Sequence, residues 1–142
     1  MADITLPTEI HLDIVTPDRL VAHDAVTAVT IPGKNGYLGI LPGHAPLLTE
    51  LASGALDYTS GGAKHTLCVN WGFAEVLGDR VIVLANSAER AEEIDVKRAE
   101  TAKNRAEERL KRFDDPRIDM ERAREALRRA MARLETVHTL RG

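Results

Sequence analysis

The sequence is poor in the residues that build disulfide frameworks, metal sites and aromatic surfaces. Its single cysteine, Cys68, excludes a disulfide within the chain. Its five histidines are scattered without paired spacing, so we expect no zinc site. Aromatic residues make up 4% of the chain, and four of the five precede residue 75, which predicts that the main core lies in the first part. No apolar run approaches the roughly 20 residues of a membrane span.

Residues 1–87 carry the pattern of short β-strands. Ile10–Ile14 and Thr27–Ile31 alternate with period two, and further short apolar runs follow at residues 37–41, 56–59, 66–69, 73–77 and 81–84. Glycine-rich turns separate several of these runs, and no long helical pattern interrupts them. This pattern predicts an N-terminal antiparallel β-sandwich, or flattened barrel, rather than a parallel α/β sheet.

Residues 88–142 follow the helical period and carry far more charge. They hold 15 basic and 13 acidic residues, whereas residues 1–87 hold four basic and nine acidic ones. Asn86 with Glu89 resembles a capping signal for a first helix, and Pro116 breaks the pattern after Asp114. Asp115 or Asp119 is expected to cap a second helix. The fold class is therefore β + α, with a C-terminal antiparallel two-helix hairpin.

The apolar stripe of each expected helix is narrow and rich in alanine. A buried alanine methyl contributes about 0.8 kcal/mol, whereas a buried leucine contributes about 1.5–3 kcal/mol. A seam of this kind is consistent with helices that separate at low cost, and equally with a static cap on the sandwich. The stripes consist of Ala99, Ala102, Ala106, Leu110 and Phe113 in the first helix and Ala123, Leu127, Ala130, Leu134 and Val137 in the second.

No enzyme motif is present. Gly33-Lys34 lacks the spacing and the Ser/Thr of a phosphate loop, and no acid/base constellation stands out. The segment from Gly36 to Leu48 predicts a rigid corner, which is either a turn packed on its own core or an apolar rim that docks on a partner. The arginines of the helical part are either ordinary surface ion pairs or a site for a polyanion.

Several segments, in order, resemble the epsilon subunits of F-type ATP synthases. The loop Gly39-Ile40-Leu41-Pro42-Gly43-His44-Ala45-Pro46-Leu47-Leu48 is similar to the signature loop of that family. The segments at residues 72–76, 83–85, 88–95 and 129–134 resemble the following ones, so the likeness runs from about residue 8 to residue 138. Tyr37 and Trp71 depart from it: some relatives carry an acid at the first position, and smaller residues are common near the second.

The resemblance implies a non-catalytic rotor subunit. The sandwich is expected to bind the gamma subunit and the c-subunit ring, with Leu38, Ile40, Leu41, Pro42 and His44 at the partner interface and Trp71 packed against gamma. The helices are expected to close into a hairpin, or to extend along gamma into the alpha/beta head and inhibit ATP hydrolysis. Proton flow would thus be coupled to ATP synthesis at the cytoplasmic face of the bacterial inner membrane, where the chain is peripheral.

Some bacterial members of the family bind ATP in the closed hairpin, and this sequence retains the matching positions. They are Glu89, Asp95, Arg98, Arg129 and Arg133. The resemblance implies that the arginines hold phosphates, while Glu89 and Asp95 contact the base or ribose or orient an arginine. No other cofactor and no metal is expected. The alternatives are a stand-alone ATP-sensing module and, with less support from the sequence, a nucleic-acid-binding module.

Overall fold

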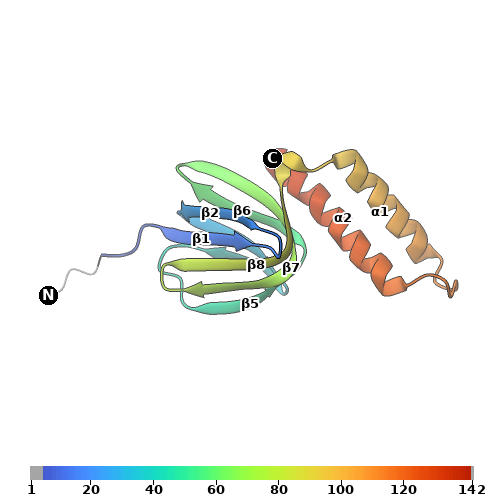
Figure 1. The fold of residues 1–142 in the computed structure, drawn as a ribbon, viewed down its shortest axis with the longest axis horizontal. Helices are drawn as coiled ribbons and strands as arrows, with labels where there is room; N and C mark the ends of the chain where they lie inside the picture. The colour runs from blue at the N-terminus through green and yellow to red at the C-terminus, as the bar shows by residue number, and fades with distance from the viewer. Residues whose placement is uncertain (1–4, 142) are drawn as a thin grey trace.

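The structure, a computed structural model, describes residues 5–141 and shows a β-sheet domain beside two antiparallel helices (Figure 1). The strands are β1 (Ile10–Val15), β2 (Leu20–Val26), β3 (Ala28–Gly33), β4 (Gly36–Ile40), β5 (Leu47–Leu51), β6 (Gly54–Ser60), β7 (Ala63–Leu77) and β8 (Arg80–Arg90). A 3-10 turn, η1 (Ala91–Glu93), leads into α1 (Val96–Lys111) and α2 (Met120–Arg141). This order confirms the predicted fold class.

The strands form one sheet in the order β2-β1-β8-β7-β5-β3-β4, and β6 bridges β3 and β7. Every pairing is antiparallel except that of β1 with β8, which is parallel and places the first and last strands side by side. The prediction missed β2 and β5, and it divided β7 into two runs. Strand β7 is one element of 15 residues that changes partner, from β6 up to Val69 to β5 from Gly72 onward.

The alternating residues of the strands meet in one apolar core between the two layers of the sandwich. Burial of this kind contributes about 25 cal/mol per Å² of apolar surface removed from water, which makes it the main source of stability. Tyr58, 2% exposed, is the only aromatic side chain of this core, and its hydroxyl donates to Asp24 at 3.0 Å. The fully buried members include Leu12, Ile14, Val26, Val29, Ile31, Ile40, Leu56, Leu67, Val69, Val81 and Val83.

The first helix begins later than the sequence predicted. Strand β8 continues to Arg90, beyond the expected domain boundary after residue 87, because Ala85 and residues 87 to 90 pair with β7. The capping signal assigned to Asn86 and Glu89 was therefore wrong. Asp95 caps α1 instead, since its carboxylate accepts a hydrogen bond from the backbone N–H of Arg98 at 3.0 Å.

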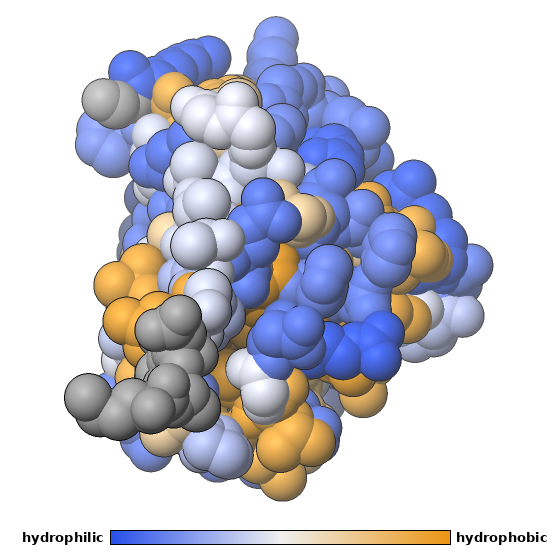
Figure 2. Space-filling view, turned by 90° about the vertical axis from the view of Figure 1, so that its left-hand side faces the viewer, coloured by the Kyte–Doolittle hydropathy of each residue, from blue (hydrophilic) through white to orange (hydrophobic). Residues whose placement is uncertain are grey.

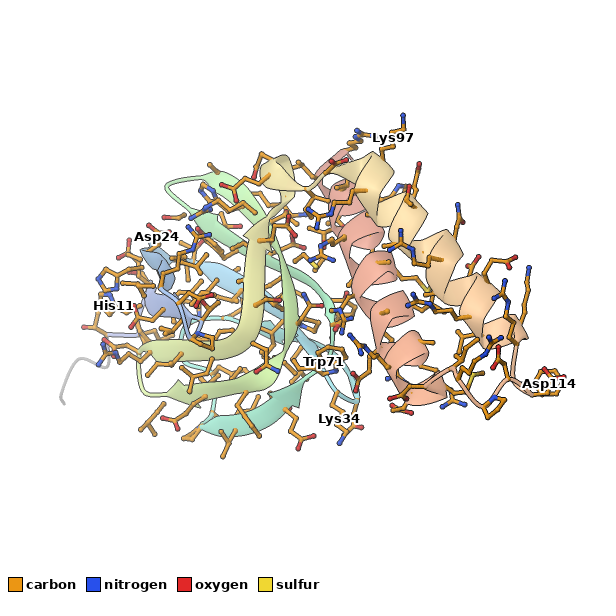
Figure 3. The ribbon with its side chains drawn as sticks, turned by 45° about the vertical axis from the view of Figure 1, so that its right-hand side comes forward. His11, Asp24, Lys34, Trp71, Lys97 and Asp114 are labelled. Atoms are coloured by element: carbon orange, nitrogen blue, oxygen red, sulfur yellow. The ribbon has the colours of Figure 1, made fainter. Side chains whose placement is uncertain are left out.

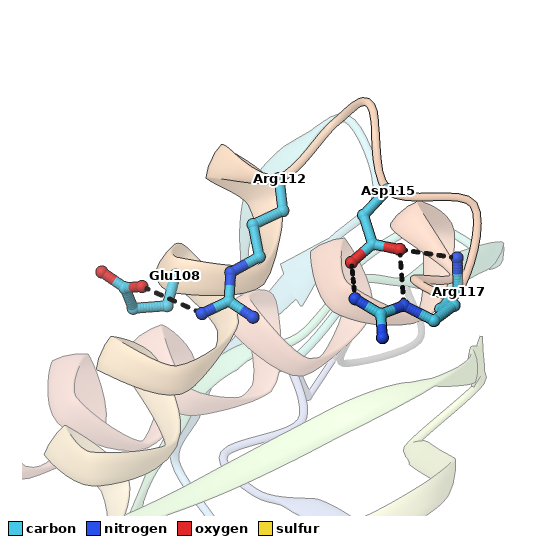
Figure 4. Close-up of polar contacts among 4 residues, drawn as sticks. All are labelled: Glu108, Arg112, Asp115 and Arg117. Atoms are coloured by element: carbon cyan, nitrogen blue, oxygen red, sulfur yellow. Dashed lines mark hydrogen bonds and ion pairs between the residues drawn. The ribbon is translucent and has the colours of Figure 1, made fainter.

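The loop between the helices gives the two candidate aspartates different roles. Asp119 caps α2 by accepting from the backbone N–H of Arg122 at 3.1 Å. Asp115 orders the loop, because it accepts from both the backbone and the guanidinium of Arg117 (Figure 4). This pairing holds the pKa of the Asp115 carboxyl below its usual value. One turn earlier, Arg112 lies 3.9 Å from Glu108 at the end of α1.

The hairpin lies against the sandwich through α2, with α1 on the outer side (Figure 1). Buried alanines line the seam between the helices, as the stripe predicted: Ala99, Ala106, Ala123 and Ala130. A second small cluster joins α2 to the sandwich and consists of Cys68, Ile94, Ala132 and Val137. Within residues 5–141, no helix is both long enough and apolar enough to cross a membrane.

Candidate functional site

A cavity of about 470 Å³ opens between the two helices and the end of β8. We call it the hairpin cavity. Its volume falls in the range of small-molecule sites. All five residues that the resemblance assigned to ATP line it, although they come from β8, the cap of α1, and both helices. The charged and polar lining residues are Glu89, Glu93, Asp95, Arg98, Thr101, Arg105, Arg129 and Arg133.

The hairpin cavity carries four arginines against three carboxylates, and one carboxylate is already engaged by an arginine. The Nε of Arg133 donates to Glu89 at 2.9 Å, which ties α2 to β8. Asp95 is occupied as the helix cap. Within residues 5–141, the guanidinium groups of Arg98 and Arg105 have no carboxylate within 4.0 Å, so both are free to meet an anion.

Arg129 has an aromatic partner instead of a carboxylate. Its guanidinium carbon lies 5.9 Å from the centre of the Trp71 ring, within the range of a cation–π contact. Trp71 lies on the side of the sandwich that faces α2 (Figure 3). The residue that the sequence placed against a gamma subunit therefore contacts the chain's own hairpin in this structure.

A hydrogen bond and a buried thiol also join α2 to the sandwich. The Tyr37 hydroxyl donates to Glu135 at 2.9 Å, and burial followed by this hydrogen bond raises the pKa of Tyr37 to about 12. Cys68 is fully buried beneath α2, and burial raises the pKa of its thiol to about 11. Specific side-chain contacts therefore add to the apolar cluster that joins α2 to the sandwich.

A larger cavity, about 1110 Å³, lies on the other side of α2, between that helix and the sandwich. We call it the groove. Trp71, Phe73 and Met131 contribute its apolar lining. Each of its charged groups already has a partner: Lys34 lies 2.7 Å from Glu50, Glu135 accepts from the Tyr37 hydroxyl, and Arg128 lies 3.9 Å from Glu121. Pairing of this kind leaves little free charge for a ligand.

The predicted partner residues lie at the end of the sandwich remote from the hairpin, or on the strand that leads there. Leu41 is 62% exposed, Leu38, Pro42 and His44 are half-buried, and Ile40 is 0% exposed within the core. Ile40 therefore supports the loop from beneath and has no surface for a partner here.

Further exposed apolar side chains lie at the same end of the sandwich, where β1 begins and β7 ends beside this loop. Leu6 is 74% exposed and Leu77 is 60% exposed. Figure 2 looks onto this end and shows apolar side chains scattered among hydrophilic ones. The loop keeps its shape through a hydrogen bond from the backbone N–H of His44 to the carbonyl of Leu41, at 3.1 Å.

Two charged residues of the hairpin cavity were not among the predicted ligands. Arg105 follows Arg98 by seven residues, two helical turns, so helical spacing alone could have identified it. Glu93 lies in η1, and its position depends on a turn that the sequence did not predict.

Comparisons with known proteins agree with the resemblance. Residues 9–91 match the family model "ATP synthase, Delta/Epsilon chain, beta-sandwich domain", and residues 92–138 match the "long alpha-helix domain" of the same family. The ATP synthase epsilon chain of Koribacter versatilis is 61% identical over 70% of each chain. That of Nitratidesulfovibrio vulgaris is 50% identical over 88% of this chain and 92% of its own length.

Solved structures give the same result. A chain in the Euglena gracilis mitochondrial ATP synthase, solved as OSCP, F1 and c-ring, superposes with a TM-score of 0.82 at 27% identity, covering 92% of this chain and 82% of its own length. A chain in the Tetrahymena thermophila ATP synthase central stalk and c-ring shares the fold with a TM-score of 0.53 at 16% identity, covering 94% of this chain and 95% of its own. The chain therefore belongs to the delta/epsilon family of ATP synthase subunits, as an epsilon-type subunit that is not itself catalytic.

Proposed function

We propose that the chain is a rotor component of the central stalk of a proton-translocating ATP synthase, and that its hairpin regulates ATP hydrolysis in response to ATP. The sandwich binds the gamma subunit and the c-ring, and the helices act on the alpha/beta head when they leave the docked position. Membership of the family and the likeness to a chain of an F1/c-ring complex support the rotor role. The complex would hold the chain at the cytoplasmic face of the inner membrane.

The observation that carries the regulatory role is the convergence of Glu89, Asp95, Arg98, Arg129 and Arg133 on the hairpin cavity. The cavity exists only while α1 and α2 lie side by side near the end of β8, because all three elements supply its walls. A ligand that binds there adds its binding free energy to the docked state alone. ATP in this cavity therefore favours the docked hairpin and opposes the extended, inhibitory one.

The charge of the hairpin cavity fits a nucleotide polyphosphate. Among the residues that the structure describes, no carboxylate pairs with the Arg98 or Arg105 guanidinium, and guanidinium groups bind phosphate oxygens through paired N–H donors. Arg129 adds a third cation at the edge of the cavity. The Glu89–Arg133 pair is positioned to orient the arginine rather than to bind phosphate freely, since its distance is 2.9 Å. Glu93, and the carboxylate oxygen of Asp95 that does not cap α1, remain as acceptors for ribose or base.

The test is a calorimetric titration of the full chain with Mg-ATP. We expect binding in the micromolar to low-millimolar range, and loss of that binding in Arg129→Ala/Arg133→Ala. The matched control is Arg124→Ala/Arg128→Ala, which removes the same charge from the same helix but leaves the lining of the hairpin cavity intact. Equal loss in both double variants would indicate a general charge effect and contradict the site. Absence of binding at several millimolar ATP would refute the ATP response and leave the rotor role standing.

The partner surface is tested separately, by reconstitution with the gamma subunit and the c-ring. We expect Leu41→Asp to weaken assembly, because this exposed side chain lies in the loop at the far end of the sandwich. Phe113→Asp is the control, since Phe113 is 80% exposed in the inter-helix loop. If the chain binds ATP but has no affinity for the gamma subunit, the stand-alone ATP sensor is favoured instead.

A further inference from the structure

Strand β7 turns a strained corner at Trp71 and Gly72. Trp71 has a φ of 41° and is the only residue other than glycine with a positive φ among residues 5–141. Gly72 follows with a φ of 130°, and a Cβ there would lie 1.8 Å from the carbonyl oxygen of Leu84. Strain of this size persists only where the surrounding structure enforces it.

The corner also explains why Trp71 faces the hairpin. Val69 points into the core before it, whereas Ala74 and Val76 do so after it, so the inward parity of the strand reverses between them. Trp71 would continue the inward series of Val69 if the strand were regular. The reversal turns it out of the core toward α2, where it meets Arg129.

The Trp71–Arg129 pair forms part of the boundary between the two cavities. Arg129 lines the hairpin cavity, and Trp71 lines the groove. Within residues 5–141 no carboxylate lies within 4.0 Å of the Arg129 guanidinium, whereas its neighbour Arg133 is tied to Glu89. The indole face is therefore the contact that orients Arg129. A guanidinium that lies over a ring keeps the N–H donors in its own plane available for an anion.

We propose that Trp71 is a positioning residue for the nucleotide site: it holds the Arg129 guanidinium at the hairpin cavity, so that phosphate meets an arginine that is already ordered. The inference rests on the proposed ATP binding. It adds a sandwich residue, Trp71, to the determinants of nucleotide affinity, whereas the expected ligands lie in and next to the hairpin. Because Trp71 belongs to the sandwich and Arg129 to α2, Arg129 is ordered in this way only while the hairpin is docked.

The test is a double-mutant cycle on the affinity for Mg-ATP in the full chain. Pre-ordering one long side chain changes Kd by about 2- to 12-fold, so Trp71→Leu should raise Kd by that factor. In an Arg129→Ala background, Trp71→Leu should have no further effect. Trp71→Phe retains an aromatic face and should restore part of the affinity, and it remains informative if the leucine variant folds poorly. Phe73→Leu, on the same strand and also lining the groove, is the matched control and should bind as the wild type does.

Fluorescence supplies an independent readout, since Trp71 is the only tryptophan in the chain. Mg-ATP should change its emission in the wild type and leave it unchanged in Arg129→Ala. If Trp71→Leu raises Kd equally in both backgrounds, or leaves Kd unchanged, Trp71 does not act through Arg129 and the inference is refuted while ATP binding stands. If the wild type binds no Mg-ATP, the proposed ATP response fails first, and this inference fails with it.

Discussion

Cys68 offers a direct measure of how firmly the hairpin is docked. It is the only thiol in the chain, it is 0% exposed beneath α2, and it shares a small cluster with Val137 of that helix. Burial raises the pKa of the thiol from 9.0 to about 11, which lowers the thiolate fraction near pH 8 about 100-fold. Labelling by a thiol reagent therefore requires α2 to move away first.

The perturbation we choose is Val137→Ala. Val137 is 7% exposed, and the change removes two carbon atoms from the cluster, at about 0.8 kcal/mol each. The resulting loss of about 1.6 kcal/mol increases the population of the undocked state about 15-fold. The labelling rate of Cys68 in native buffer should rise by the same factor, because the rate follows the open population when reclosing is fast.

The control is Leu140→Ala on the same helix, where the side chain is 40% exposed. It should leave the labelling rate within about twofold of the wild type. Saturating Mg-ATP should slow labelling in the wild type, since it stabilises the docked state by mass action. If Val137→Ala labels at the wild-type rate, or if Cys68 reacts only in denaturant, then the thiol is exposed by unfolding of the sandwich and the reasoning about local undocking is refuted.

Three further predictions concern stability. Because the pKa of Cys68 is raised in the folded state, the neutral thiol favours folding below about pH 9, and this contribution of about 2–3 kcal/mol is lost as the pH rises toward 11. Chemical denaturation across that pH range should show the loss of stability in the wild type and a smaller loss in Cys68→Ala. Gly72→Ala should lower the free energy of unfolding by about 3 kcal/mol or more, whereas Gly39→Ala, with no atom within 4 Å of the added Cβ, should change it little; thermal unfolding compares the two. Asp119→Ala removes the cap of α2 and should cost about 1 kcal/mol and some helical signal in circular dichroism, an effect that Asp114→Ala should not show.

The sequence predicted the architecture well because its two periods are distinct. Alternation over Ile10–Ile14 and alanine spacing in the hairpin follow directly from the geometry of strands and helices. Strand β2 was missed because its apolar positions do not alternate cleanly: Leu20 is 56% exposed, while Ala22 and Val26 are buried. The start of α1 was misplaced because Asn86 and Glu89 match a cap locally, but both lie within β8, where Glu89 pairs with Cys68 of β7.

The candidate site was predicted residue by residue only through the family resemblance. Helical spacing placed Arg129 and Arg133 on one face, but nothing local in the sequence brings Glu89 to them, since 44 residues separate Glu89 from Arg133. The contact between Trp71 and Arg129 was not predictable either. It depends on a corner in β7 that reverses the inward face of the strand. That corner is made by the positive φ angles of Trp71 and Gly72, which a pattern of apolar residues does not reveal.

The chain leaves the sandwich at the end opposite the Leu41–His44 loop. The proposed partner surface and the docked hairpin therefore lie at opposite ends of the sandwich. Strand β8, which lies between β1 and β7, completes the sheet before the first helix begins, so release of α2 breaks no strand pairing. Under the proposed function, a partner bound at the loop end would therefore keep its contacts when α2 leaves the sandwich at the other end. The sandwich side chains that α2 must leave behind lie at the end that faces the hairpin, so substitutions there should change the free energy of undocking without changing the loop end. They include Tyr37, Cys68, Trp71 and Glu89.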